Sequence, residues 1–525
     1  MAAFAHNNII AMIITLSTSC VLKHMHPNLH IDGLFKYCIA YLVIVKYITF
    51  ELGKMFPFFG GKNGNFSIFL GFMERNKQEI TVGFISLGCP KNVVDSERML
   101  AEIVQAGFPI TNETDNADVV VVNTCGFIAP AEAESLEAIK HAVDCKLNGA
   151  VKKVVVAGCL SERLGAELNK KIDGIDAVVG LNQRDNISKI IENIFSDVLG
   201  GGFCPVKPLP PGSDRVPDDR CRLLITPKHW AYLRISEGCN HRCSFCTIPS
   251  IRGRFRSKLM ELVLAEAEEL VSAGVVELNV IAQDTTSYGR DLKIKHGLSA
   301  LLKELDKIAS LEWLRLMYLY PTGIDGELIE TIAKSEKIVR YLDIPLQHVN
   351  DKILKSMRRP DTKDKLLRLI EDLRLAMPDI VLRTTLIVGF PGETDRQFEE
   401  LMDFVRWARF DALGCFKFYP ETGTAAAELP DQVPDQVKQQ RLDELMLTQQ
   451  EIAFARNKDR IGDKVTCLVD SVGSKRLATG RYYGQAPDID SVCIIKRCSA
   501  KPGQLIEVKV VGTQDYDLIV QQIKY

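Results

Sequence analysis

The sequence predicts an α/β protein with three parts in order: an open parallel α/β sheet, an incomplete (β/α)6 barrel and a small C-terminal β-barrel. Short β-branched runs alternate with amphipathic stretches in two series, and a segment rich in glycine and proline separates the series. After the second series, a long polar stretch is followed by short strand-like runs with turn residues between them. A chain of 525 residues is too long for one core, so about three domains are expected.

The composition is that of an ordinary globular protein, with 46% hydrophobic and 25% charged residues. The formal net charge of −2 gives no overall attraction for nucleic acid, although a local basic patch is compatible with it. The 15 cysteines are an odd number at irregular spacing, far below the density of a secreted disulfide scaffold. We therefore expect thiols or metal ligands in a reducing compartment, which predicts a cytoplasmic location.

Residues 1–72 differ from the rest of the chain. Two apolar runs, Asn8–Leu22 and Leu34–Phe50, resemble membrane segments, but the first is short and the second contains two lysines. Both fall below the roughly 20 clean apolar residues that a span needs, and no lysine or arginine precedes the first run. We interpret this part as an atypical extension from a start codon assigned too early, with Met73 as the expected start and no membrane partner. A targeting or membrane-associated segment is the alternative.

The first α/β series predicts a domain over residues 78–198. Its strand-like runs are apolar along most of their length, as strands covered on both faces of a parallel sheet must be. The predicted strands are Ile80–Leu87, Asp118–Asn123, Val154–Ala157 and Ala177–Val179, and the predicted helices are Val94–Gln105, Pro130–Leu147 and Ser161–Lys171. Residues 199–226, with three successive glycines and a Pro-Leu-Pro-Pro run, are typical of an interdomain linker.

The second series predicts a domain over residues 227–457. The predicted strands are Tyr232–Ser236, Val276–Ala282, Leu314–Leu319, Tyr341–Ile344, Leu382–Val388 and Leu413–Phe418, with helices such as Met260–Ala273, Leu298–Ile308 and Asp364–Ala376. Six such units indicate an incomplete barrel, whose chemistry is expected at the C-terminal ends of the strands. Asp435–Asn457 reads as a long polar helix that begins after Pro434, and residues 458–525 as a small β-barrel.

Three cysteines share one position in the first series. Cys89, Cys125 and Cys159 each follow a predicted strand and lie about one βα unit apart. The C-terminal ends of parallel strands meet at one edge of an open sheet, so the three thiols can converge there. Three thiolates suit an iron–sulfur cluster. Cysteines that fill the core by coincidence are the alternative.

A second group, Cys239, Cys243 and Cys246, directly follows the first strand of the barrel-like domain. A four-iron cluster usually takes four thiolates, so three local thiolates leave one iron open to another ligand. A zinc knuckle with His241 as the fourth ligand is the alternative. His241 lies inside the loop between two of the cysteines, which makes tetrahedral closure awkward.

This C-x3-C-x2-C loop after a strand resembles the radical S-adenosylmethionine (SAM) superfamily. The resemblance implies that the amino and carboxylate groups of SAM bind the open iron of a 4Fe-4S cluster on these cysteines. One electron from the cluster then cleaves SAM to a 5′-deoxyadenosyl radical, and the protein supplies positioning.

Three further motifs narrow the resemblance to the methylthiotransferases within that superfamily. They are Gly88–Asn92 followed by Val94–Glu97, Asn123–Phe127 and Ala157–Cys159. The similarity covers Gln78 to Tyr525 and implies a methylthiotransferase N-terminal domain, a radical SAM domain and a TRAM domain. It also implies a second, auxiliary 4Fe-4S cluster on Cys89, Cys125 and Cys159, and no catalytic side chain beyond the cluster ligands.

Within this family the sequence is similar to the branch that methylthiolates an aspartate of small-subunit ribosomal protein twelve. The strings that carry this similarity are Gly88–Asn92, Thr247–Gly253, Ala282–Gly289, Tyr320–Gly323 and Ala486–Asp490. It implies that sulfur passes through the auxiliary cluster and is methylated by one SAM, while a radical from a second SAM removes hydrogen from the aspartate β-carbon. The donors of electrons and of sulfur are not identified by it. A tRNA adenosine methylthiotransferase is the close alternative, and a non-catalytic iron–sulfur RNA-binding or electron-transfer protein is the alternative from another class.

The resemblance also implies SAM contacts at two strand ends. Gln283 and Asp284 end the second strand of the barrel-like domain, where capping of the strand is the alternative role. Arg383, with Gly389 and Glu393 in the Gly-Phe-Pro-Gly-Glu string, flanks the fifth strand, where the glycines alternatively serve a tight turn.

The distribution of basic residues gives a second indication of the substrate class. The basic run Arg252–Lys258 suits an anionic partner, with a solvated charged face as the commoner explanation. Residues 461–525 hold nine Lys/Arg against seven Asp/Glu, which is close to neutral for a module expected to bind RNA. The module therefore suits a basic ribosomal protein at least as well as RNA, and the run Arg252–Lys258 could supply positive charge from the central domain. The other cysteines share no position and are expected to be core or incidental residues.

Overall fold

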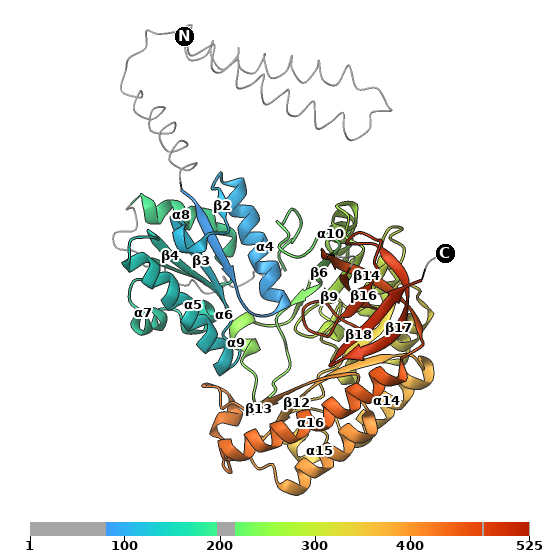
Figure 1. Ribbon diagram of the computed structural model, residues 1–525. Coiled ribbons are helices and arrows are strands. Elements are labelled where there is room, and N and C mark those ends of the chain that lie inside the picture. The colour runs from blue at the N-terminus through green and yellow to red at the C-terminus, as the bar shows by residue number, and fades with distance from the viewer. Residues whose placement is uncertain (1–79, 197–215, 475–476, 524–525) are drawn as a thin grey trace, which may run out of the picture. The chain divides into compact units, whose positions relative to one another are not determined.

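The computed structural model describes residues 80–196, 216–474 and 477–523 (Figure 1). The described residues belong to one compact unit. The predicted extension, residues 1–72, and most of the predicted linker lie outside the described residues. In the described part of the chain, no helix is both long and apolar enough to cross a bilayer.

The first described part is an open, five-stranded parallel sheet of order β2-β1-β3-β4-β5. Its strands are β1 (Val82–Ser86), β2 (Ile110–Thr111), β3 (Val119–Thr124), β4 (Lys153–Gly158) and β5 (Ala177–Val179). Its helices are α4 (Pro90–Gln105), α5 (Ala129–Leu147), α6 (Cys159–Leu164), α7 (Glu167–Lys171) and α8 (Ile187–Phe195), with the 3-10 turns η1 (Thr114–Asn116) and η2 (Arg184–Asn186). Strands β3, β4 and β5 are buried at nearly every residue, because helices cover both faces of the sheet.

Several details differ from the sequence prediction, including helix α8, which was not predicted. The predicted helix Ser161–Lys171 is divided into α6 and α7, because Gly165 adopts a positive φ of 50° between them. Strand β2 was not predicted; it has only two residues and pairs at the edge of the sheet. A strand so short carries too few alternating residues for a periodic pattern.

The second part is a six-stranded parallel sheet of order β13-β12-β11-β10-β9-β6. Its strands are β6 (Trp230–Arg234), β9 (Glu277–Ile281), β10 (Trp313–Leu316), β11 (Ile338–Asp343), β12 (Val381–Val388) and β13 (Ala412–Lys417), with a short hairpin of β7 (Ser236–Glu237) and β8 (Arg256–Ser257). Its helices are α9 (Ile248–Arg252), α10 (Met260–Ser272), α11 (Gly297–Leu305), α12 (Gly326–Lys334), α13 (Asp351–Ser356), α14 (Lys363–Ala376) and α15 (Asp395–Ala408), with η3 (Thr285–Ser287), η4 (Pro321–Gly323) and η5 (Ala425–Glu428). Because β13 and β6 do not pair, the barrel is open and the predicted incomplete (β/α)6 architecture is confirmed.

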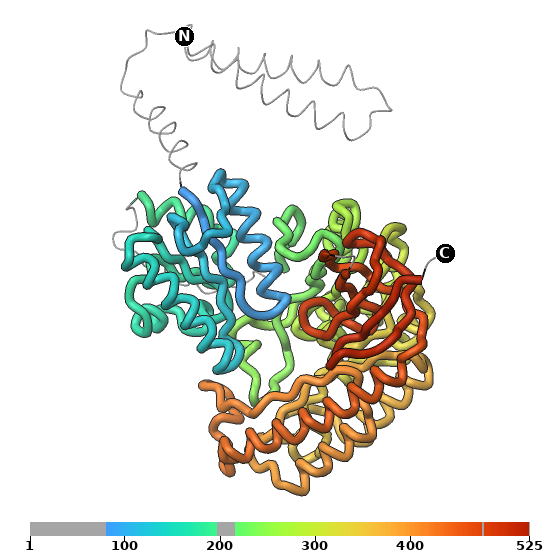
Figure 2. Tube along the Cα trace, in the orientation of Figure 1, coloured from blue at the N-terminus to red at the C-terminus, as the bar shows by residue number. Residues whose placement is uncertain are grey.

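The C-terminal part begins after the long helix α16 (Asp435–Asp459), which packs along β13 and α15 (Figure 1 and Figure 2). The strands β14 (Lys464–Val472), β15 (Ala478–Tyr482), β16 (Cys493–Lys496), β17 (Leu505–Gln514) and β18 (Asp517–Gln522) close into a barrel of order β14-β15-β16-β18-β17. The predicted small barrel is confirmed. Cys467, Cys493 and Cys498 fill its core, as expected for cysteines without a shared motif.

One hydrophobic cluster joins this barrel to the second sheet. It contains residues near the starts of sheet strands, such as Trp230, Trp313 and Val381, together with barrel residues such as Leu468 and Ile495. The barrel therefore packs toward the N-terminal ends of the sheet strands and leaves their C-terminal ends, where chemistry is expected, for other contacts. The division into domains at residues 198, 226 and 457 stays a prediction.

Candidate functional site

Three cysteines follow the C-terminal ends of strands in the first sheet. Cys89 precedes α4 after β1, Cys125 follows β3, and Cys159 begins α6 after β4. Cys125 and Cys159 are buried and Cys89 is half-buried. The charge of Cys89 raises the pKa of both other thiols, and the charge of Cys125 raises that of Cys159, so the three sulfur atoms are close neighbours. The structure thus brings together the first predicted trio.

Two glycines allow the loops to approach so closely. Gly88 has a φ of 90°, and a Cβ there would lie 2.8 Å from the Cβ of Cys125. Gly158 has a φ of 96°, and a Cβ there would lie 2.3 Å from the side-chain oxygen of Asn123. At both positions the backbone is left-handed and a Cβ would clash with a neighbouring side chain. Glycine is therefore required directly before Cys89 and before Cys159.

Polar side chains fix these loops to one another. The amide of Asn92 donates to the carbonyls of Leu87 and Thr124, at 2.5 and 3.2 Å. The amide of Asn123 donates to the carbonyl of Asn92 at 3.0 Å. The hydroxyl of Ser135 bonds both the backbone N–H and the carbonyl of Cys125. The strand ends are therefore cross-linked by buried hydrogen bonds, which hold the thiols in place.

The second predicted trio, Cys239, Cys243 and Cys246, lies in the loop after β6 and β7. Burial, with smaller contributions from neighbouring cysteine charges, raises the pKa of Cys239 to about 11 and that of Cys246 to about 12. Cys243 acts on Cys239, and both act on Cys246, so the three sulfur atoms are neighbours. The structure thus also brings together the second predicted trio.

Contacts from distant segments hold this loop. The backbone N–H of Ser244 donates to the carbonyl of Met357 at 3.0 Å, and the carbonyl of Ser244 accepts from the N–H of Ala426 at 2.8 Å. The guanidinium of Arg359 hydrogen-bonds Cys243 and lies over the ring of Tyr320, at 4.3 Å from its centroid. Sequence reasoning missed Arg359, because it follows a short helix and belongs to no motif.

The zinc-knuckle alternative finds no support in this loop. His241 stacks on Tyr320, with ring centroids 3.7 Å apart, and its Nε2 lies 2.7 Å from Oδ2 of Asp284. Ligands of one tetrahedral zinc ion lie about 4 Å apart or less. Across residues 80–196, 216–474 and 477–523, neither cysteine trio has all its sulfur atoms within 4.8 Å of one another. Thiols spread further apart suit a cluster, which binds each on a separate iron.

A single short segment joins the two trios. Cys246 lies just before α9, and its Sγ accepts from the N–H of Ile248 at 3.4 Å. At the other end of α9, Arg252 is buried and donates to Sγ of Cys159 at 3.2 Å. The hydroxyl of Thr247 also reaches the carbonyl of Phe127, at 3.4 Å. Residues 246–252 therefore connect a ligand candidate of one trio to a ligand candidate of the other.

Arg252 belongs to a buried network of charges. Its guanidinium pairs with Asp95 at 3.0 Å and Glu237 at 3.1 Å. Arg234 pairs with the same two carboxylates and with Asp219, at 2.6 to 2.9 Å. Further members are Arg98, Arg184, Arg222, Lys258, Glu97, Glu266 and, at the surface, Asp185. Acidic and basic side chains occur in equal number, so the network is neutral and its charges are paired.

This network corrects the interpretation of the run Arg252–Lys258. Arg252 and Lys258 are 3% and 1% exposed, so they do not belong to a solvated face and are not accessible to an anionic partner. Of the run, only Arg254 is exposed. The network also includes Asp219, which has no exposed surface although it lies in the predicted linker. The end of that linker is thus anchored in the core.

Gln283 and Asp284, the predicted SAM contacts after β9, are hydrogen-bonded to residues before and within the loop of the second trio. Gln283 donates from its amide to Oε1 of Glu237 at 3.0 Å, and its own Oε1 is buried without a hydrogen-bond partner among the described residues. The carboxylate of Asp284 is bound by His241, Thr286 and Ser287. Gln283 is therefore free to accept from a ligand, whereas Asp284 orients the loop and His241.

The remaining predicted contacts, on and after β12, are engaged within the protein. Arg383 lies early in β12 and pairs with Asp343 at 2.8 Å and Asp490 at 3.4 Å. Glu393 accepts from the N–H groups of Gly389 and Phe390 and pairs with Arg441. Burial raises the pKa of Glu393 to about 7. The contacts of Glu393 shape the turn after β12, whereas those of Arg383 lie near the start of the strand. A role of either residue in SAM binding stays a prediction.

A buried lysine lies beside the first trio. Lys91 is 6% exposed, and its Nζ lies 3.1 Å from the centroid of the Tyr318 ring. Burial lowers its pKa to about 8, while the charge of Cys89 raises it. Tyr318 follows β10, and its N–H donates to Asp343 at 3.1 Å. The ammonium thus lies where the first sheet meets the C-terminal strand ends of the second. Sequence reasoning quoted Lys91 in a motif without giving it a role.

The comparisons with known proteins agree with this arrangement. The sequence matches an uncharacterized protein family, UPF0004, over residues 81–180, the Radical SAM superfamily over 233–405 and a TRAM domain over 461–523. The ribosomal protein uS12 methylthiotransferase RimO of Pelotomaculum thermopropionicum is 46% identical over 444 residues, which are 84% of this chain and 98% of that protein. RimO of Syntrophomonas wolfei is 43% identical over 84% of this chain and 99% of its own length.

Among solved structures, the radical SAM methyltransferase TsrM of Kitasatospora setae is 17% identical. The match covers 66% of this chain and 75% of that chain, with a TM-score of 0.48. The RimO proteins, in contrast, match this chain from end to end of their own sequences, across both cysteine trios and the barrel. The chain therefore belongs to the RimO family of radical SAM methylthiotransferases.

Proposed function

We propose that this enzyme methylthiolates the β-carbon of an aspartate in ribosomal protein uS12, in the cytoplasm. Its family uses an iron–sulfur cluster and SAM, and its relatives are named for the uS12 reaction. The observation that carries the proposal is the link between two cysteine trios by residues 246–252, since a methylthiotransferase must bring sulfur and a radical to one substrate.

The proposal assigns one 4Fe-4S cluster to each trio. Cys239, Cys243 and Cys246 would hold the cluster that binds SAM, and Cys89, Cys125 and Cys159 the auxiliary one. When bound, SAM and the first cluster supply the radical chemistry that an unactivated C–H bond requires. The fit rests on the three neighbouring thiols in each trio and on sulfur separations too wide for a single ion. The donors of electrons and sulfur remain to be identified as separate partners.

The protein's own residues then orient the reactants. We propose that the amino group of SAM donates a hydrogen bond to Oε1 of Gln283, which has no partner among the described residues. Arg252 donates to Cys159 from a guanidinium held by two carboxylates, so its position is fixed and it favours the thiolate form. Asp284 keeps His241 stacked on Tyr320 beside the loop of the second trio.

Lys91 is proposed to receive the carboxylate of the substrate aspartate. Its ammonium has no carboxylate within ion-pair distance among the described residues, and it rests on the face of Tyr318 near Cys89. A buried cation of this kind is stabilised by an anion that arrives with the substrate. A target aspartate held there would present its β-carbon beside the trio that is assigned to sulfur delivery.

We expect Lys91→Met to lower kcat/KM for uS12 by about 100-fold, because truncating one partner of a buried charge pair costs about 2–5 kcal/mol. The rate of SAM cleavage in the absence of substrate should be unchanged, and so should the iron content of the enzyme. Lys91→Arg should restore part of the rate, and Lys140→Met, at an exposed position on α5, should have no effect. A Lys91→Met enzyme with normal uS12 turnover would rule out this role.

The tRNA alternative is not favoured. Phosphate recognition needs exposed basic side chains, and two of the four basic residues in the run Arg252–Lys258 are paired in the core. In the barrel, Arg481 pairs with Glu277 and Asp470, so it too is engaged. The proposal is tested by mass spectrometry of uS12 from cells with and without this gene: the modified aspartate should be lost with the gene.

A further inference from the structure

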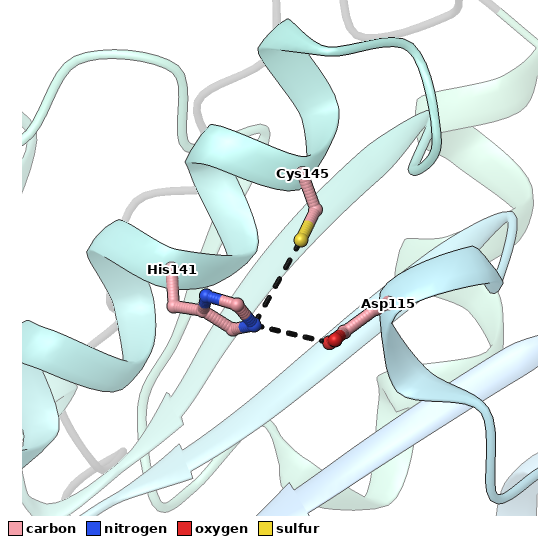
Figure 3. Close-up of side chains that lie close together, drawn as sticks. All are labelled: Asp115, His141 and Cys145. Atoms are coloured by element: carbon pink, nitrogen blue, oxygen red, sulfur yellow. Dashed lines mark hydrogen bonds and ion pairs between the residues drawn. The ribbon is translucent and has the colours of Figure 1, made fainter.

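A third cluster of ligand-type side chains lies on the surface of the first α/β part, apart from both cysteine trios. His141 and Cys145 are four residues apart on α5, so they lie on one face of the helix. Asp115 reaches them from η1, the turn that precedes β3. Figure 3 shows the three side chains pointing toward one another from these two elements. Neither the motifs nor the proposed function uses them.

Their distances are those of ligands around one metal ion. Nε2 of His141 lies 3.1 Å from Oδ1 of Asp115 and 3.9 Å from Sγ of Cys145. All three ligand atoms lie within 4.8 Å of one another, and no other such group occurs within the described ranges of the chain. Around a tetrahedral zinc ion, ligand atoms of these types are about 3.3–3.6 Å apart. Small side-chain rotations are enough to reach that geometry from the one observed.

The alternative is a Cys-His-Asp nucleophile. In such a triad, the carboxylate bonds the ring nitrogen opposite to the one that faces the thiol, so that the imidazole can accept the thiol proton. Here the carboxylate and the thiol both approach Nε2, and Nδ1 points away from both (Figure 3). Three ligand atoms gathered within 4.8 Å of one another, with Nδ1 left out, favour a bound cation over a proton relay.

We propose that Asp115, His141 and Cys145 bind a divalent cation of intermediate softness, Zn²⁺ before others, with a fourth position open to water. A thiolate with an imidazole suits zinc, and one carboxylate completes a three-ligand site. The nearby carboxylate of Asp144 adds negative charge, while Lys146, one residue after Cys145, is engaged by Asp176 and the carbonyl of Gly174. The cation would brace the turn before β3 against the helix that follows that strand.

The site is separate from the proposed clusters. Asp115 lies before the N-terminal end of β3, whereas Cys125 follows its C-terminal end. The six residues of that strand span about 20 Å. Binding of zinc would displace the proton of the Cys145 thiol, because the thiolate is the form that binds the metal. The inference does not depend on which substrate the enzyme modifies.

The test is zinc titration of the full-length enzyme with its iron–sulfur clusters in place. We expect one zinc per chain with no loss of iron, and zinc-edge X-ray absorption showing one sulfur at about 2.3 Å with nitrogen or oxygen at about 2.0–2.1 Å. His141→Ala and Cys145→Ser should weaken binding at least about 100-fold, since even outer-shell changes cost about 10–100-fold. Cys221→Ser, which removes an exposed thiol elsewhere, is the matched control and should bind normally.

Three results would overturn the proposal. Equal zinc affinity in the wild type and in both variants would place the ion elsewhere. Two or more sulfur ligands, or release of iron, would mean that zinc occupies cluster cysteines. A dissociation constant above about 1 mM would show that Asp115, His141 and Cys145 are a chance arrangement of side chains.

Discussion

Replacing Cys239, Cys243 and Cys246 together with alanine should abolish SAM cleavage and leave about half of the iron, because the trio of Cys89, Cys125 and Cys159 is a separate three-thiolate site. The reciprocal triple replacement should spare SAM cleavage and stop sulfur insertion. Iron content and 5′-deoxyadenosine release under anaerobic, reducing conditions measure the two effects.

The matched control is the double variant Cys221→Ala and Cys498→Ala, which removes one exposed and one buried thiol outside both trios. It should keep all the iron and full activity. If either triple variant lost all its iron while it remained folded, the assignment of two independent clusters would be wrong.

Arg234→Met should lower the free energy of unfolding by about 3–5 kcal/mol, since it leaves buried carboxylates without their partner. Arg234 has no exposed surface and pairs with Asp95, Asp219 and Glu237, which come from α4, the predicted linker and β7. The loss should appear as a lower urea concentration at the midpoint of unfolding, because the contacts between the first sheet and the second are weakened.

Arg406→Met is the control for that change. Arg406 is also bound by two carboxylates, Glu399 and Asp403, but its side chain is 46% exposed. Exposed pairs contribute about 0–1 kcal/mol, so the midpoint should hardly move. Equal midpoints for the two variants would show that the buried network does not hold the parts together.

The strands could be predicted because parallel strands covered on both faces are continuous apolar runs, and Ala177–Val179 has the same bounds in the structure. The convergence of Cys89, Cys125 and Cys159 followed from the same rule, since strand ends share one sheet edge. The division of α6 from α7 was not predictable from periodicity, because it depends on the backbone conformation of one glycine.

The charged residues were harder to interpret. Arg252 and Lys258 alternate with other residues in a way typical of an exposed segment, and only the tertiary structure supplies their carboxylates from α4, the linker and α10. The role of Lys91 has the same origin, because Tyr318 is distant in the sequence. Local patterns identify which residues carry chemistry, but long-range pairing decides which charges are available to a substrate.

The most direct test of the central claim is to incubate the purified enzyme, with both clusters reconstituted, with SAM, a sulfide source and a reductant, together with uS12 or with bulk tRNA. Mass spectrometry of both products then locates the modification. Our account predicts that one methylthio group replaces a hydrogen on an aspartate of uS12 and that the tRNA is unchanged. A methylthio group on adenosine, with none on the aspartate, would contradict it.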